Sequence, residues 1–175
     1  MDGLAFGPPQ IVVLLLAVQR LAELRLANRN TRRLLDQGGR EVGRAHYPLF
    51  ILLHSAWLAA LFFLVPADAP VVWPVVGLLV LLQLARYWVI RTLGPYWTTR
   101  VITLPQAPLV RGGPFRWVRH PNYCVVVAEI AAVPLAFGAW QLALVFSLAN
   151  VLLLTHRIRV EETALRPRRS MAPQG

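Results

Sequence analysis

Residues 119–123, with the sequence Arg-His-Pro-Asn-Tyr, place a guanidinium, an imidazole and a phenol close together between two apolar stretches. His120 is biased toward an extended backbone by the proline that follows it, and Pro121 suits the first turn of a helix. The free amides and the positive dipole of such a helix start favour an anion, and Arg119 would add to this preference. The turn therefore indicates a site for a carboxylate-bearing small molecule, although the same residues could simply anchor a helix at a membrane interface.

A second charged cluster lies at residues 157–162, at the end of the last apolar stretch. Arg157 and Glu161 are four residues apart, so they would share one face if the last helix continues beyond the membrane. Such a cluster could also be a surface set of salt bridges. Its expected position on the same side of the membrane as residues 119–123 favours a pocket shared by both segments.

Glu129 lies inside an apolar stretch, where an acidic group costs about 2.5–3.5 kcal/mol at the centre of a bilayer. We therefore expect it to face the interior of the protein with a partner, for which Asn122 and Asn150 are candidates. Desolvation favours the protonated form of a carboxyl group in this setting. Glu129 could hydrogen-bond a substrate, accept a proton, or form a structural bond between helices.

The chain has more apolar surface than one soluble core of 175 residues can bury, since 57% of its residues are hydrophobic and its mean hydropathy is +0.52. A helix needs roughly 20 apolar residues to cross the hydrocarbon layer of a membrane. We predict an all-α, polytopic membrane bundle of about five transmembrane helices. The predicted spans are residues 8–27, 48–65, 71–90, 122–138 and 140–156, with a hairpin turn at residues 137–139 between the last two.

The basic residues predict on which side of the membrane each connection lies. Arginines are concentrated in residues 28–47, in residues 91–121 and in the C-terminal tail, whereas residues 66–70 carry only Asp68. The positive-inside rule places the N-terminus outside, and both long connections and the C-terminus in the cytoplasm. This distribution also explains the net charge of +10 and the pI near 11.5. A nucleic-acid partner is not expected, because such binders display their basic stripe on a soluble domain, and none is visible.

Residues 1–175 form a single membrane-embedded domain in this interpretation, because no repeat, low-complexity tract or linker divides them. Within the connection 91–121, residues 93–104 begin with a turn and run into a β-branched stretch, which indicates a short extended segment. The glycines and prolines that follow exclude a continuous helix. A loop of about thirty residues in so small a chain is usually functional. The connection 28–47 is instead typical of a solvated basic connector.

Together these motifs resemble the isoprenylcysteine carboxyl methyltransferase superfamily of membrane-embedded methyltransferases. The resemblance covers roughly residues 90–165. It rests on the motifs Leu109-Val110-x-x-Gly113-x-Phe115, Arg119-His120-Pro121-x-Tyr123 and the element 157–165. It implies a cytoplasmic loop that binds S-adenosylmethionine, and an enzyme that methylates an oxygen of a lipophilic substrate. The substrate would enter sideways from the bilayer and the cofactor from the cytoplasm.

The resemblance also assigns residues to the two ligands. The positions assigned to the cofactor pocket are Leu109, Val110, Gly113, Phe115, His120, Pro121, Asn122, Tyr123 and Glu162. The positions assigned to the substrate end and to catalysis are Arg119, Glu129, Arg157 and Glu161. A phenolic substrate would need a base, for which Glu129, Glu161 or His120 are candidates, whereas a carboxylate would need only an arginine clamp. No residue is assigned to a metal.

Several features are closer to a bacterial branch of this superfamily, the alkylpyrone and alkylresorcinol O-methyltransferases. These features are residues 28–30, residues 45–48, and the intramembrane Glu129 followed by Pro134. The branch implies a lipid-like phenol as the acceptor, with a prenylcysteine as the alternative acceptor, and the cytoplasmic membrane of a bacterium as the location. Two other functions stay open, namely an NADPH-dependent membrane reductase of the sterol reductase type and a small non-enzymatic channel or scaffold.

Overall fold

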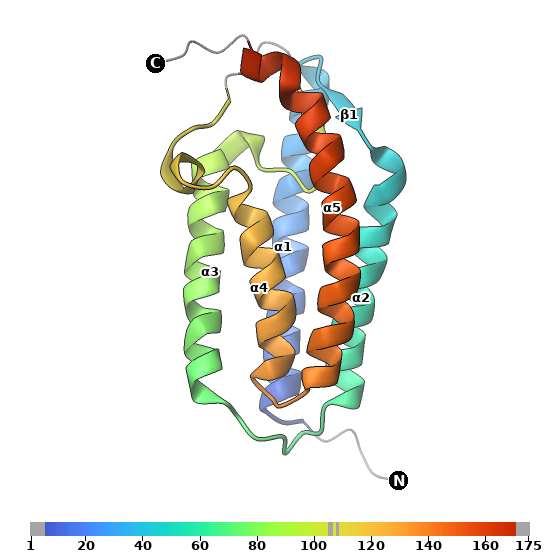
Figure 1. Ribbon diagram of the computed structural model, residues 1–175, viewed down its shortest axis with the longest axis vertical. Coiled ribbons are helices and arrows are strands. Elements are labelled where there is room, and N and C mark those ends of the chain that lie inside the picture. The colour runs from blue at the N-terminus through green and yellow to red at the C-terminus, as the bar shows by residue number, and fades with distance from the viewer. Residues whose placement is uncertain (1–5, 105–106, 108, 171–175) are drawn as a thin grey trace.

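The computed structural model describes residues 6–104, 107 and 109–170, with the backbone alone for residues 167–170. In this part of the chain five α-helices stand side by side (Figure 1). They are α1 (Pro8–Asp36), α2 (Tyr47–Leu64), α3 (Trp73–Leu93), α4 (Pro121–Leu135) and α5 (Trp140–Ser170). The strands of the described residues are short, and they are β1 (Arg40–Val42) and β2 (Val101–Thr103). The prediction of an all-α polytopic membrane bundle is confirmed.

Two helices are longer than the apolar windows that predicted them. The first window ends at residue 27, but α1 continues to Asp36, and α5 continues beyond the fifth window to Ser170. Hydropathy marks the part of a helix that lipid covers, whereas the backbone hydrogen bonds continue through Arg and Glu, which are good helix formers. The predicted extension of the last helix is therefore present, and it carries Arg157 and Glu161.

The hairpin between α4 and α5 forms at the predicted turn. Gly138 has a φ of +71°, the left-handed conformation that glycine adopts without steric penalty. The fourth window extended to residue 138, whereas α4 ends at Leu135. Residues 136–138 are apolar like the helix, so their hydropathy could not reveal the turn, although the glycine indicated it.

Three segments are long and apolar enough to cross a membrane, and they are Arg44–Leu64, Trp73–Tyr96 and Trp140–Arg166. α4 is apolar but has only 15 residues, and α1 contains several charged residues. A complete crossing by these two helices therefore stays a prediction. Large apolar side chains such as Leu15, Leu52 and Leu152 are exposed on the bundle, as expected for surfaces that lipid covers. The chain is an integral membrane protein.

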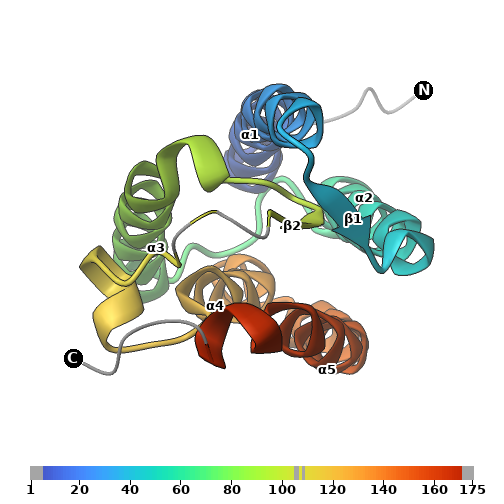
Figure 2. The same cartoon turned by 90° about the horizontal axis from the view of Figure 1, so that it is seen from above.

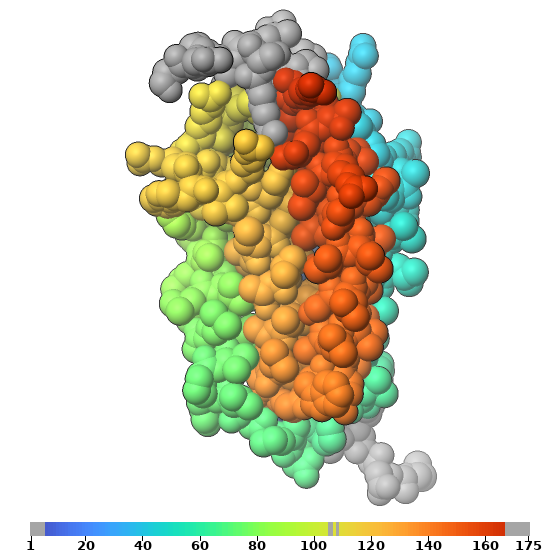
Figure 3. Space-filling view, in the orientation of Figure 1, coloured from blue at the N-terminus to red at the C-terminus, as the bar shows by residue number. Residues whose placement is uncertain are grey.

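The helices surround a common centre in the order α1, α2, α5, α4 and α3 when seen from above (Figure 2). On the face shown in Figure 3, α4 lies between α3 and α5. The main apolar core joins Trp57 and Leu61 of α2 with Ile130 and Val133 of α4, all of them 1% exposed or less. This core holds the helices together. The candidate site lies at the other end of the bundle.

A small antiparallel sheet joins the two long connections at one end of the bundle. β1 pairs with β2, with Glu41 opposite Ile102. The extended segment predicted in residues 93–104 is therefore confirmed. The connection 28–47 is more ordered than the solvated connector that we expected, because its strand satisfies the backbone hydrogen bonds of the other connection.

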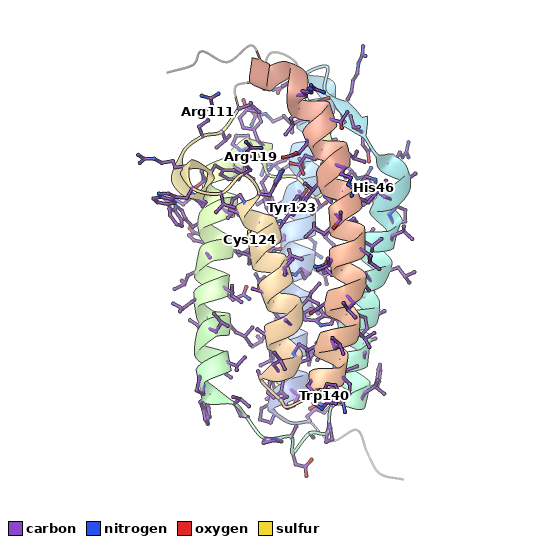
Figure 4. All side chains as sticks on the ribbon, in the orientation of Figure 1. His46, Arg111, Arg119, Tyr123, Cys124 and Trp140 are labelled. Carbon is purple, nitrogen blue, oxygen red and sulfur yellow. The ribbon has the colours of Figure 1, made fainter. Side chains whose placement is uncertain are left out.

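The two ends of the bundle differ in content. α1 begins at one end, and both long connections lie at the other end with the last turns of α5 (Figure 1). Figure 4 shows Arg111, Arg119 and Tyr123 at this second end, far from Trp140. The predicted grouping of the long connections on one side is thus confirmed. Which of the two ends faces the cytoplasm stays a prediction.

Candidate functional site

A cavity of about 430 Å³ lies at the end of the bundle that carries the long connections. The connection between α3 and α4 forms most of its wall. The first turn of α4 and the part of α5 from Arg157 to Leu165 also contribute to the wall. This volume falls within the roughly 300–1,000 Å³ typical of small-molecule sites. The cavity is therefore large enough for a nucleoside-sized ligand.

The lining of the cavity divides by chemistry. The apolar lining residues are Leu34, Leu93, Val101, Ile102, Leu104, Ala107, Leu109, Val110, Phe115 and Leu165. The charged or aromatic polar lining residues are Tyr96, Arg100, Arg111, Arg119, His120, Tyr123, Arg157 and Glu161. Because four arginines face one glutamate, the polar side carries net positive charge and favours an anionic group of a ligand.

The Tyr123 hydroxyl links the two charged groups predicted at the substrate end. Arg157 Nε donates to this hydroxyl at 2.8 Å, and the hydroxyl donates to the Glu161 carboxylate. No direct ion pair between Arg157 and Glu161 is present among the described residues. The predicted sharing of one face is confirmed, and the structure adds that a tyrosine from α4 mediates it.

Arg157 is held from several sides and is only 8% exposed. Its Nη2 donates to the carbonyl oxygen of Thr99 at 2.7 Å, and its guanidinium lies 5.2 Å from the centroid of the Phe50 ring. Thr99 is itself hydrogen-bonded through its side chain to the Tyr47 hydroxyl at 3.0 Å. Three segments thus fix one guanidinium in place, and a fixed guanidinium is well suited to orient an oxygen of a ligand.

His120 and Arg119 precede α4 but differ in their surroundings. The His120 ring stacks on Tyr123 with centroids 5.2 Å apart. Its Nδ1 lies 3.8 Å from Glu161 and its Nε2 lies 3.4 Å from Glu162, so the imidazole is placed to exchange a proton with a carboxylate. The Arg119 side chain is 78% exposed and lies 3.8 Å from Glu162, which is a loose surface contact.

The structure brings together most of the predicted site residues. Those that line the cavity are Leu109, Val110, Phe115, Arg119, His120, Tyr123, Arg157 and Glu161. Those outside its lining are Gly113, Pro121, Asn122, Glu129 and Glu162. Gly113 has a φ of +54°, and a Cβ there would lie 2.5 Å from Thr92 Oγ1, so backbone geometry explains this glycine. Pro121 is the first residue of α4, as its position after His120 predicted.

Sequence reasoning missed two arginines of the cavity, Arg100 and Arg111. Both belong to the acid-free connection 91–121, and we used these two arginines only to assign topology. Arg100 is held by Glu41 of β1 at 3.1 Å and lies 4.9 Å from the centroid of the Tyr47 ring. The pairing of β1 with β2 brings these groups together, and strands of three residues are too short to recognise from sequence.

Glu129 lies below this cavity, in a separate network of charged side chains. Its side chain is 2% exposed, and it accepts hydrogen bonds from Arg20 Nη2 at 2.6 Å, from Gln83 Nε2 at 2.6 Å and from Arg86. The predicted partners Asn122 and Asn150 are therefore wrong. The structure also separates Glu129 from Arg119, Arg157 and Glu161, with which we had grouped it at the substrate end, because these three line the cavity and Glu129 does not.

Glu23 completes the network on α1. It pairs with Arg20 at 2.6 Å and lies 3.5 Å from Arg86 Nη1. The two arginines and two glutamates neutralise one another, and two guanidinium groups are the expected counter-ions of an ionised carboxylate. Our expectation of a protonated Glu129 assumed an isolated acid. We did not expect that Arg20 of α1 and Arg86 of α3 would both lie beside Glu129.

Comparison with known proteins agrees with this architecture. The family model of the isoprenylcysteine carboxyl methyltransferase (ICMT) family matches residues 75–167, which include every lining residue of the cavity except Leu34. The uncharacterized protein YpbQ of Bacillus subtilis (strain 168) is 36% identical over 159 residues, covering 89% of this chain and 95% of the relative. An uncharacterized protein of Haemophilus influenzae (strain Rd) is 28% identical over 153 residues, covering 83% and 88%. No solved structure matches this chain.

Proposed function

Because the chain belongs to the isoprenylcysteine carboxyl methyltransferase family, we propose that it transfers a methyl group from S-adenosylmethionine to an oxygen of a lipophilic acceptor. The observation that carries this proposal is the contact chain of Arg157, Tyr123 and Glu161 on the wall of a nucleoside-sized cavity. The cavity lies at one end of a membrane bundle. A water-soluble cofactor and a bilayer-dissolved acceptor can both reach such a place.

The cavity residues fit the chemistry of the cofactor. Leu109, Val110 and Phe115 would contact the adenosine part, as apolar and aromatic side chains do in small-molecule sites. The arginines of the polar side would pair with the carboxylate of the amino-acid part, and Glu161 would offset the positive charge of the sulfonium. When bound, the cofactor would supply a methyl group whose carbon–sulfur bond breaks as the carbon–oxygen bond of the product forms.

Positioning would provide most of the catalysis in this reaction. Methyl transfer to oxygen needs an in-line approach and exclusion of water more than strong acid–base groups. Arg157, held by Thr99 and Tyr123, would orient the acceptor oxygen. A carboxylate acceptor reacts without losing a proton, whereas a phenol would release its proton to Glu161 or His120.

The acceptor would be an apolar molecule that reaches the site from the bilayer. The sequence features in residues 28–30 and 45–48 favour an alkylpyrone or alkylresorcinol over a prenylcysteine. In this proposal the N-terminus lies outside, the cavity opens to the bacterial cytoplasm, and membrane lipids surround α2, α3 and α5. No nucleic acid takes part.

Two measurements test the proposed function. Isothermal titration of the purified protein should show binding of S-adenosylhomocysteine and none of NADPH. Membranes containing the protein should transfer radiolabel from S-adenosylmethionine into extracted lipid when prenylcysteine, alkylresorcinol or alkylpyrone acceptors are added. Binding of NADPH alone would replace the proposal with a reductase, and binding of neither nucleotide would favour a channel or scaffold. Label found only in lipid amines would contradict methylation of oxygen.

A further inference from the structure

The C-terminal half of α1 carries an arginine-rich surface at the end of the bundle where the long connections lie. A shallow groove of about 640 Å³ on this surface, here called the α1 groove, is separate from the cavity of the candidate site. Its lining residues are Arg25, Asn28, Arg29, Arg32, Arg33, Asp36 and Gln37. Four of them are arginines and Asp36 alone is acidic, so the lining carries a net charge of +3.

The arginines of the α1 groove are available to an external anion. Arg25, Arg29, Arg32 and Arg33 are all exposed. Within the part of the chain that the structure describes, their guanidinium groups have no ion pair and no hydrogen bond. By contrast, Arg100 of the cavity is held by a carboxylate. Like charges on neighbouring turns of a helix repel one another, and a bound anion would relieve this repulsion.

The arginine surface continues an exposed apolar face of α1. Leu14, Val18 and Leu21 are exposed on this face. Steps of three or four residues keep side chains on one face of a helix, and the next steps lead to Arg25 and Arg29. Arg25 lies about 6 Å beyond Leu21 along the helix, which matches the thickness of the headgroup layer of one leaflet. The guanidinium groups therefore begin at the level of the lipid phosphates when lipid chains cover the apolar face.

We propose that the α1 groove binds the phosphate of an anionic phospholipid, whose acyl chains lie along the apolar face formed by Leu14, Val18 and Leu21. Guanidinium groups bind phosphate oxygens through charge-assisted, often paired hydrogen bonds. A soluble polyanion would match the charge of the groove but would leave the adjoining apolar face uncovered. This inference does not depend on the proposed methyl transfer, because the α1 groove and the cavity share no lining residue.

Two short-chain lipids that differ only in their headgroup test this inference. Titration of the full-length protein in an uncharged detergent compares a phosphatidylglycerol with the phosphatidylcholine that has the same acyl chains. The phosphatidylglycerol should bind at least about tenfold more tightly at low salt, since each arginine near an anionic headgroup changes the affinity about fivefold. This preference should decrease as salt is added, because exposed charges are screened.

The variant Arg29→Gln/Arg32→Gln removes two charges from the α1 groove and should lower the preference to near one. The matched control is Arg40→Gln/Arg44→Gln, which lowers the net charge equally at exposed positions outside the groove. It should keep the preference within about twofold of the wild-type value, because exposed charges away from the ligand are screened. The variant Arg29→Lys/Arg32→Lys retains both charges and should retain most of the preference.

Several results would overturn the inference. These are equal affinity of the wild type for the two lipids, equal losses in the groove variant and its control, and loss of the preference in the lysine variant. Tighter binding of a poly-glutamate peptide or an oligonucleotide than of the phosphatidylglycerol would identify a soluble polyanion as the ligand instead. Glycerophosphate at the same concentration should not displace the lipid, because it has no acyl chains to contact the apolar face. Displacement by glycerophosphate would reduce the α1 groove to a site for phosphate alone and contradict the proposal.

Discussion

Two clusters of guanidinium and carboxylate groups lie along α4, and they differ in what surrounds them. At the start of the helix, Arg157 and Glu161 are linked through Tyr123 and line a cavity. About two turns deeper, Glu129 is closed in by Arg86 and Arg20, and these three residues are outside the cavity lining. The residue types are the same, but one cluster is open to a ligand and the other is complete without one.

Charged side chains inside this membrane bundle serve two different purposes. The deep network consists of Arg20, Glu23, Arg86 and Glu129. It holds α1, α3 and α4 together, because each of its charges is neutralised by a neighbour from another helix. The upper cluster consists of Arg157, Tyr123 and Glu161. Its guanidinium is held by the Thr99 carbonyl and the Tyr123 hydroxyl, and Arg157 also lines the cavity. An intramembrane acid such as Glu129 is therefore a poor guide to the candidate functional site of this chain.

The largest effect is expected when the deep network is broken. Glu129→Ala leaves the buried guanidinium of Arg86 and the partly buried guanidinium of Arg20 with Glu23 as their carboxylate, and removal of one partner of a buried pair destabilises by about 3–5 kcal/mol. Glu161→Ala should lower the free energy of unfolding by about 1 kcal/mol or less, because Glu161 is partly exposed. Denaturant titration in detergent compares the two variants. Equal losses would remove the distinction between the clusters.

The next effect concerns catalysis at the upper cluster. Arg157→Ala removes the fixed guanidinium, and loss of one preorganised donor lowers turnover by about 10²–10³-fold. Arg159→Ala is the matched control, because Arg159 lies on the same helix and is exposed. Radiolabel transfer from S-adenosylmethionine measures both variants. Comparable loss in the control would mean that the charge of α5 matters, and not the position of Arg157.

A smaller effect is expected from the hydroxyl that joins the upper cluster. Tyr123→Phe keeps the ring that stacks on His120 but removes the oxygen shared by Arg157 and Glu161. The loss of these charge-assisted hydrogen bonds should lower kcat/KM by about tenfold. Tyr47→Phe, which removes a hydroxyl bonded to Thr99, is the comparison variant. If Tyr123→Phe has full activity, the hydroxyl link is not needed to place Arg157.

The smallest effect is expected at the exposed rim of the cavity. The Arg119 side chain is 78% exposed, so its contribution is screened by water and salt and should be about 0.2–1 kcal/mol. Arg119→Ala should therefore weaken the binding of S-adenosylhomocysteine by at most about fivefold, and less at high salt. A loss of a hundredfold, independent of salt, would instead place Arg119 in direct contact with the ligand.

The residues of the upper cluster could be predicted because their chemistry follows from local spacing. Arg157 and Glu161 are one helical turn apart, and Pro121 begins α4 directly after His120. The partners of Glu129 could not be predicted in this way. Arg20 and Arg86 are far from it in sequence, and Arg86 lies near the end of an apolar window, where an arginine is also expected at a headgroup boundary.

The amino-acid sequence alone determined the membrane class, the approximate extent of five helices, the α4–α5 hairpin and most of the polar cavity lining. These features depend on hydropathy, on proline and glycine geometry and on helical spacing, all of which act within a few residues. The tertiary structure was needed to show that Tyr123 joins Arg157 to Glu161 and that Glu41 of β1 holds Arg100. Such contacts depend on how the helices are rotated and arranged around the bundle, and their energies come from neighbours distant in sequence.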